Sequence, residues 1–379
     1  MNPQNFSQFI HETFKTRELI PLHEPVFKGN EKKYIEETID STFVSSVGPF
    51  VNRFEEEITM FTKIKKSIAL VNGTAGLHVC LKVIGVKESD EVLTQALSFV
   101  ATSNAIAYCG AKPVYIDVDL DTMGLSPKHL KNFLENYGEI RENGTYNKKT
   151  KKRISACLPM HTFGFMSRID EIIKICNLWK IPVIEDAAEA LGSYLKQKSA
   201  GSFGKMSVFS FNGNKIITAG GGGIICTNNV KLAEKAKFLS TTAKDPHKWE
   251  YFHSNLGFNY RMPNLNAALV LAQLEMFNNI LESKKSLFLT YHDYFKGKNL
   301  LVKPPKETIW NYWLMSIRLS NLEERNKFLY ETNRLKVMTR PIWKLLYRLP
   351  MYSNCQRDDQ KNARFLEERI VNIPSSARI

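Results

Sequence analysis

Short β-like runs alternate with helical patterns between residues 66 and 213, and this alternation constrains the fold more than any other feature of the chain. Strands are expected at residues 90–93, 113–118 and 207–213. Three more are expected at the beginnings of the stretches 66–86, 153–164 and 181–195. The expected helices follow Asn72, begin near Phe99 and cover 169–180. Strands that alternate with helices form a mainly parallel sheet with helices on both faces. A large α/β domain is therefore predicted.

Polar side chains stand at the ends of several expected strands, and these are Thr74, His161, Asp186 and Ser210. In open α/β sheets, ligands bind outside the carboxyl ends of the strands. We therefore expect these four residues to lie near one binding site.

The pattern changes after about residue 245. Residues 263–295 are predicted to form one long helix, residues 306–319 a strand, and residues 321–335 a further helix. A chain of 379 residues is long for one domain. The predicted division is an N-terminal segment (1–30), a large domain (31–250) and a small α+β C-terminal domain (251–379).

The formal net charge of +14 is compatible with binding to nucleic acid, to a membrane surface or to an anionic small substrate. Six of the basic residues lie within residues 141–153, which we expect to be an exposed turn. The chain has no basic patch interleaved with aromatic residues and no helix-turn-helix pattern. Nucleic acid is therefore not predicted as a partner.

The 6 cysteines stand singly, without a C-x-x-C pair, so buried thiols are predicted rather than disulfides or a metal site. The chain contains no apolar run of the length needed for a transmembrane helix, and its first residues are polar and charged. A cytoplasmic protein without a membrane partner is therefore expected.

Residues 210–223, SFNGNKIITAGGGG, place a lysine close to four glycines. This stretch does not match the P-loop pattern, because Asn214 precedes Lys215 and Ile216 follows it. The chain also lacks a G-x-G-x-x-G that follows a strand. We therefore expect the glycines to form a tight bend or to let the backbone pass close to another segment.

Asp186 and Lys215 suggest covalent chemistry. Pyridoxal phosphate uses a lysine for its Schiff base and an acidic residue against its ring nitrogen. Taken alone, the two residues would be better explained as a buried capping aspartate and a surface lysine. Further residues favour the cofactor: Gly73 and Thr74 begin a helix that could bind phosphate, Ser210 could add a hydroxyl, and Phe99 could stack on the ring.

The chain resembles the DegT/DnrJ family of nucleotide-sugar aminotransferases over nearly its whole length. The motifs that carry the resemblance are VNGTAGLH (71–78), EDAAEALGS (185–193), SFNGNKIITAGGGG (210–223) and GFNYRMPNLNAA (257–268). Within the family, IPLHEPVFKGNE (20–31) and TRPIWKL (339–345) look closest to the legionaminic-acid-pathway aminotransferases. The resemblance implies the aspartate-aminotransferase fold (fold type I), with a mainly parallel seven-stranded sheet in the large domain.

The resemblance also implies site residues. Lys215 would form the Schiff base and move the proton, and Asp186 would pair with the ring nitrogen. Cofactor contacts would come from Gly73, Thr74, Phe99, Glu189 and Ser210, and from Asn259 across the interface of a homodimer. His161 and Arg261 would contact substrate. Glu189 stands where many relatives carry Gln or His, so its carboxyl is expected to be protonated or turned away from the cofactor.

The implied reaction uses L-glutamate to convert pyridoxal phosphate to its pyridoxamine form, which then aminates C4 of a nucleotide-linked 4-keto-6-deoxy sugar. A UDP- or GDP-linked N-acetylhexosamine, used for a bacterial surface glycan or a nonulosonic acid, fits this scheme. Two alternatives have the same fold: a C3 dehydratase, in which His replaces the Schiff-base lysine, and a non-catalytic regulator. Lys215 argues against the first, and the lack of an added sensing module argues against the second.

Overall fold

Seven strands form the central sheet of the computed structural model, which describes all 379 residues. Their order is β1-β11-β10-β7-β6-β2-β3, and β7 joins β6 through the isolated bridges Cys157–Val183 and Met160–Asp186. All pairings are parallel except those of β11 with β1 and β10. The predicted mainly parallel sheet is therefore confirmed. The strands are β1 Lys66–Leu70, β2 Glu91–Gln95, β3 Lys112–Ile116, β6 Arg153–Leu158, β7 Ile184–Asp186, β10 Met206–Ser210 and β11 Gly223–Thr227.

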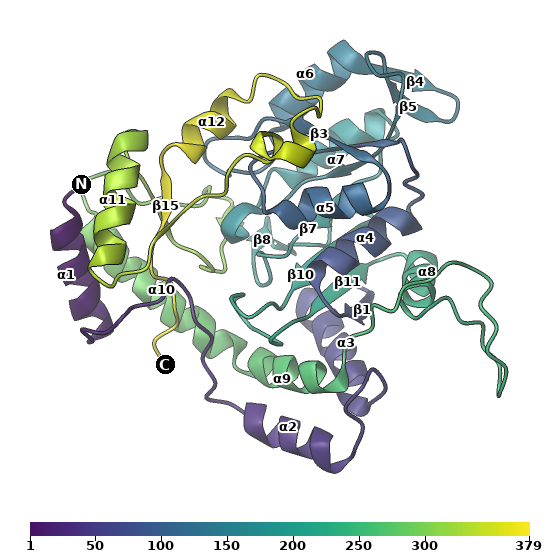
Figure 1. The fold of residues 1–379 in the computed structure, drawn as a ribbon, viewed down its shortest axis with the longest axis horizontal. Helices are drawn as coiled ribbons and strands as arrows, with labels where there is room; N and C mark the ends of the chain where they lie inside the picture. The colour runs from purple at the N-terminus through teal and green to yellow at the C-terminus, as the bar shows by residue number, and fades with distance from the viewer.

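Helices cover the sheet, and alternating side chains of the strands pack into two hydrophobic clusters (Figure 1). In β1, Ile68 and Leu70 join one cluster while Ala69 joins the other, as expected for a strand buried on both faces. The side chain of Asn72 caps α4, where a helix start was predicted, and that of Asn229 caps α8 in the same way. The helices of this part are α2 Glu31–Asp40, α3 Pro49–Thr62, α4 Gly73–Val83, α5 Val100–Tyr108, α6 Pro127–Tyr137, α7 Ile169–Leu178 and α8 Val230–Ser240.

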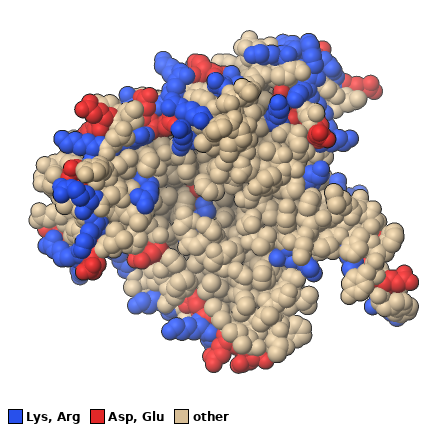
Figure 2. All heavy atoms as spheres, in the orientation of Figure 1, with Lys and Arg blue, Asp and Glu red and all other residues tan.

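The basic stretch 141–153 is more ordered than the turn that the sequence suggests. Strands β4 (Gly138–Arg141) and β5 (Gly144–Asn147) form an antiparallel hairpin, and β5 pairs with the beginning of β6. Figure 2 shows Lys and Arg side chains gathered over this corner of the molecule. Four of the six basic residues, Lys148, Lys149, Lys151 and Lys152, lie in the turn between β5 and β6, at the beginning of β6 and not at its carboxyl end.

The C-terminal residues form a smaller α+β unit. Strands β13 (Ser316–Arg318), β15 (Ile370–Asn372) and β14 (Arg340–Pro341) form its sheet. The first helix, α1 (Pro3–Phe14), packs against α11 (Leu322–Arg334) of this unit (Figure 1). The remaining elements are the strands β8 Tyr194–Leu195, β9 Lys198–Ser199 and β12 Thr308–Ile309, the helix α12 Lys361–Glu367, and 3₁₀ turns at Thr162–Gly164, Leu346–Arg348 and Pro350–Tyr352. The domain boundaries drawn from sequence stay a prediction.

Two elements differ from expectation. The predicted single helix over 263–295 is two helices, α9 (Asn264–Glu275) and α10 (Phe277–Tyr294), separated at Met276 where ψ is 0°. The N-terminal segment packs at this break, because Gln273 donates a hydrogen bond to the carbonyl of Val26. The predicted strand over 306–319 is interrupted between β12 and β13, where Tyr312 has a φ of 54° that a strand cannot accommodate.

All cysteines are buried and free, as predicted. No helix of the structure combines the length and the apolar character needed to cross a membrane.

Candidate active site

A cavity of about 670 Å³ lies at the carboxyl ends of the sheet strands, between them and residues 340–344 of the C-terminal unit. Of the residues predicted to form the site, those that line the cavity are Gly73, Thr74, Phe99, Asp186, Glu189, Ser210 and Lys215. Trp313, Arg340, Trp343 and Lys344 line the opposite wall. Strand-end residues separated by more than a hundred positions are thus brought to one site.

The first turn of α4 forms one end of the cavity. The side chain of Asn72 accepts a hydrogen bond from the amide of Ala75 at 2.8 Å, which fixes the start of the helix. The amides of Gly73 and Thr74 belong to the first turn, where N–H groups have no intrahelical acceptor. A Cβ on Gly73 would lie only 3.2 Å from the Cβ of Ser210. The turn and the serine therefore form a narrow cup suited to an anion.

Asp186 ends β7 and is 2% exposed. Its Oδ2 accepts a hydrogen bond from Oγ1 of Thr102 at 2.7 Å, and its Oδ1 accepts one from the amide of Ala188 at 3.2 Å. Burial raises the pKa of Asp186, while these two donors and nearby Lys215 oppose the rise. Sequence reasoning missed Thr102, although it lies in the first turn of α5, close to Phe99.

Lys215 forms an ion pair with Glu189, whose Oε1 lies 3.1 Å from Nζ. The other oxygen of Glu189 accepts a hydrogen bond from the amide of Phe163 at 2.9 Å. Burial, opposed by Lys215, raises the pKa of Glu189 to about 7. The side chain of Glu189 therefore lines the cavity and contacts the lysine amine.

The raised pKa of Glu189 gives a testable pH dependence. A carboxyl whose folded pKa lies above its ordinary value of 4.5 stabilises the fold below pH 4.5 and loses this contribution as the pH rises through about 7. As the pH rises from 4 to 8, the free energy of unfolding of the cofactor-free protein, measured in urea, should therefore fall by about 3 kcal/mol more than that of Glu189→Gln. Glu36→Gln, at an exposed position, should follow the wild type. Parallel curves for wild type and Glu189→Gln would disprove this assignment.

Phe99 and His161 occupy different environments. Phe99 lies just before α5, lines the cavity and is 51% exposed, so its ring is free to contact a ligand. His161 is 0% exposed and does not line the cavity. Its Nε2 lies 3.1 Å from the carboxylate of Glu185, and its Nδ1 lies 3.2 Å from the amide of Ser167. The expectation that His161 contacts substrate is therefore wrong, because both ring nitrogens are used inside the protein.

Asn259 and Arg261 lie outside the cavity lining of their own chain. Arg261 forms an isolated bridge with Leu70 at the end of β1, and its guanidinium donates to the side-chain oxygen of Asn259 at 3.2 Å. The Nε of Arg261 is buried without a hydrogen-bond partner. Within one chain, neither residue contributes to the cavity.

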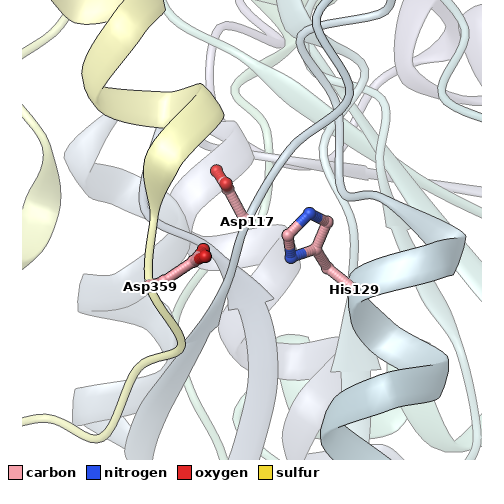
Figure 3. A group of neighbouring side chains, drawn as sticks. All are labelled: Asp117, His129 and Asp359. Carbon is pink, nitrogen blue, oxygen red and sulfur yellow. The ribbon is translucent and has the colours of Figure 1, made fainter.

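A separate group of side chains, Asp117, His129 and Asp359, has the composition of a metal site (Figure 3). However, Asp117 accepts hydrogen bonds from the amides of Asn362 at 2.7 Å and Ala363 at 2.8 Å, in the first turn of α12. His129 lies 3.4 Å from the carboxylate of Asp358. The group therefore docks α12 onto the end of β3.

The residues at the cavity fit pyridoxal phosphate. The cup at Gly73, Thr74 and Ser210 suits its phosphate, the buried carboxylate of Asp186 suits its ring nitrogen, and the amine of Lys215 suits its aldehyde. These groups come from the beginning of α4, the end of β7, and the end of β10 with the loop that follows it.

Comparisons with known proteins show the family to which the chain belongs. Residues 25–379 match the profile of the DegT/DnrJ/EryC1/StrS aminotransferase family. The chain is 37% identical over 335 residues to EpsN of Bacillus subtilis (strain 168), described as a pyridoxal phosphate-dependent aminotransferase, with 88% of this chain and 84% of EpsN covered. It is 33% identical over 356 residues to GDP-perosamine synthase of Escherichia coli O157:H7, covering 94% and 93% of the two chains. Helicobacter pylori PseC, an aminotransferase of pseudoaminic acid biosynthesis, has a similar fold, with a TM-score of 0.85, 23% identity and 94% of each chain covered.

Proposed function

We propose that this chain, which belongs to the DegT/DnrJ/EryC1/StrS aminotransferase family, transfers an amino group from L-glutamate to a sugar. The proposed acceptor is C4 of a nucleotide-linked 4-keto-6-deoxy sugar. The chain is a pyridoxal phosphate-dependent aminotransferase. The observation that carries the proposal is that Lys215, Glu189 and Asp186 line one cavity, which the first turn of α4 also lines. The names of its relatives, GDP-perosamine synthase and PseC, support a sugar substrate.

In the proposed net reaction, glutamate leaves as 2-oxoglutarate, and the sugar ketone becomes a carbon that carries one amino group and one new hydrogen. When bound, pyridoxal phosphate supplies a carbonyl that bonds to amines and a ring that withdraws electrons from the adjacent carbon. Gly73, Thr74 and Ser210 would hold its phosphate, and Phe99 would contact its ring.

The protein's own groups would manage the protons. Nζ of Lys215 would remove a proton from the donor carbon and return one to the acceptor carbon, as a general base and then a general acid. Glu189, 3.1 Å from that nitrogen, can hold the proton between steps because its pKa of about 7 lies close to neutral pH. Asp186, fixed by Thr102 and Ala188, would keep its negative charge directed at the ring nitrogen.

The experiment is an assay of purified protein with a small panel of UDP- and GDP-linked 4-keto-6-deoxy-N-acetylhexosamines and glutamate, with product identity and C4 configuration determined by NMR. A 4-amino sugar nucleotide formed together with one equivalent of 2-oxoglutarate is the expected result. Absorbance that glutamate and every other amino donor leave unchanged would contradict the proposal and favour a cofactor-binding regulator.

We also infer that two copies of the chain associate and complete each other's sites. Large apolar side chains are exposed in the loop that follows α8, with Trp249 73%, Tyr251 81% and Leu256 88% exposed. This loop projects from the right-hand side of the molecule in Figure 1, and exposed apolar groups of this size are typical of interaction surfaces. Asn259, which does not line the cavity of its own chain, follows this loop and would enter the cavity of the second copy.

Asn259→Ala should weaken retention of the cofactor by about 10- to 100-fold, the loss expected for one hydrogen bond to a charged phosphate. Asn255→Ala, in the same exposed loop, is the matched control and should retain the cofactor normally. The dissociation constant can be measured by dialysis against pyridoxal phosphate, and the oligomeric state by light scattering. Equal retention in both variants would remove Asn259 from the site.

A further inference from the structure

The segment 310–313 connects the C-terminal unit to the cavity, in place of the predicted strand. Trp310, Asn311 and Trp313 are all buried, and Tyr312 between them has a φ of 54°. A bulky residue in the left-handed region is uncommon and persists only where its surroundings hold it there. The conformation of this segment is therefore fixed by its contacts, and those contacts involve the groups that surround Lys215.

Asn311 ties the segment to the loop that carries Glu189. Its side-chain amide donates hydrogen bonds to the carbonyl of Glu189 at 2.8 Å and to that of Leu191 at 3.0 Å. Its side-chain oxygen accepts a hydrogen bond from the amide of Trp313 at 3.1 Å. One asparagine thus sets the position of Trp313 relative to Glu189.

Trp313 completes the connection to the lysine. Its Nε1 donates a hydrogen bond to the carbonyl of Asn214 at 2.7 Å, and its ring centroid lies 4.2 Å from Nζ of Lys215. A cation over an aromatic face is attracted by the ring, more strongly where water is excluded. The ammonium of Lys215 therefore lies between Glu189 and the indole of Trp313, which is 2% exposed.

We propose that Trp313 is a positioning residue that holds the amine of Lys215 at the point where the lysine reacts, a role that rests on the proposed function of Lys215. The indole fixes the backbone of the lysine's turn through Nε1 and fixes the ammonium through its face. Asn311 links Trp313 to Glu189. A displacement of the C-terminal unit would therefore move both of these residues relative to Lys215.

The test follows the rate at which the cofactor-free protein captures pyridoxal phosphate, measured by absorbance as a function of pH. The neutral amine is the nucleophile, and the ring favours the ammonium form. Trp313→Leu should therefore move the midpoint of the rate profile to lower pH by about half a unit and lower the rate at its plateau. Trp313→Phe retains an aromatic face but lacks the indole N–H. Its pH midpoint should therefore stay close to that of the wild type, while its plateau rate should be lower.

Several charged groups share the environment of Lys215. Glu189 and Asp186 face it from the end of β7 and the loop that follows, and Arg340 and Lys344 line the same cavity. His23 of the N-terminal segment is close enough that the charge of Lys215 helps to lower its pKa, after burial and Lys284. All five groups remain in each variant. A difference in pH midpoint between variants is therefore caused by the change at the tryptophan.

The matched controls are Trp310→Leu and Trp310→Phe. Trp310 is also 2% exposed and donates its Nε1–H to a backbone carbonyl, that of Phe163, at 2.8 Å, but it does not line the cavity. Circular dichroism and thermal melting verify that each variant folds. Equal midpoints for Trp313→Leu and wild type, or equal shifts for the two leucine variants, would overturn the proposal. A Lys215→Ala protein that still binds the cofactor covalently would instead contradict the proposed function.

Discussion

Lys215→Ala is expected to abolish covalent capture of pyridoxal phosphate and to reduce amino transfer by at least about 10²–10⁴-fold, the contribution of a positioned acid–base group. Nζ of this lysine is the amine that lies 3.1 Å from the carboxylate of Glu189, so alanine removes both the nucleophile and the proton carrier. The measurement is reduction with borohydride followed by mass spectrometry of the intact chain, together with the glutamate half-reaction followed by absorbance.

Lys205→Ala is the control for this experiment, because Lys205 is exposed and directly precedes β10, the strand that Lys215 follows. It should carry one reducible cofactor per chain and react with glutamate as the wild type does. If Lys215→Ala retained a reducible covalent cofactor, another amine would have to be the Schiff-base residue.

Gly223→Val is expected to destabilise the protein by about 3 kcal/mol or more and to weaken cofactor binding at the same time. A Cβ at Gly223 would lie 2.5 Å from the carbonyl carbon of Asn72 and 2.6 Å from the amide nitrogen of Gly73. These are backbone atoms of the turn that begins α4, so they cannot rotate away. The substitution must displace the cup that is proposed to hold the phosphate.

Gly221 provides a control within the same run of glycines. Its Cβ would meet only the carbonyl oxygen of Val71, at 3.9 Å, which is an ordinary contact. Gly221→Ala should therefore unfold at nearly the wild-type urea concentration and bind pyridoxal phosphate normally. Similar losses of stability and cofactor binding in Gly221→Ala and Gly223→Val would contradict this explanation. The glycines would then be required for backbone flexibility, and not because the turn at Asn72 leaves no room for a Cβ.

The strand-end residues of the site could be predicted because their positions follow from topology. Asp186 ends β7 and Ser210 ends β10, and parallel strands bring such residues to one edge of a sheet. The same reasoning does not give the direction of a side chain. His161 follows β6 as predicted, but its ring turns inward to Glu185 instead of into the cavity.

The contribution of the C-terminal unit could not be predicted from local patterns. Residues 306–319 alternate like a strand, and a tyrosine gives no signal that its φ will be 54°. That conformation is imposed by contacts of Asn311 with residues more than a hundred positions earlier in the chain. The break at Met276 likewise contains no glycine or proline, and it lies where the N-terminal segment packs.

The cavity has one wall at the strand ends of the α/β sheet and another in residues 340–344. A molecule bound in it would therefore contact both parts of the chain and hold them together. A ligand that binds only the folded protein stabilises it by about 2.7 kcal/mol when its concentration is a hundred times its dissociation constant. The melting temperature should therefore rise with the supply of cofactor. A newly made chain that has not yet acquired its cofactor is more easily opened and degraded, which couples the lifetime of this protein to the availability of pyridoxal phosphate.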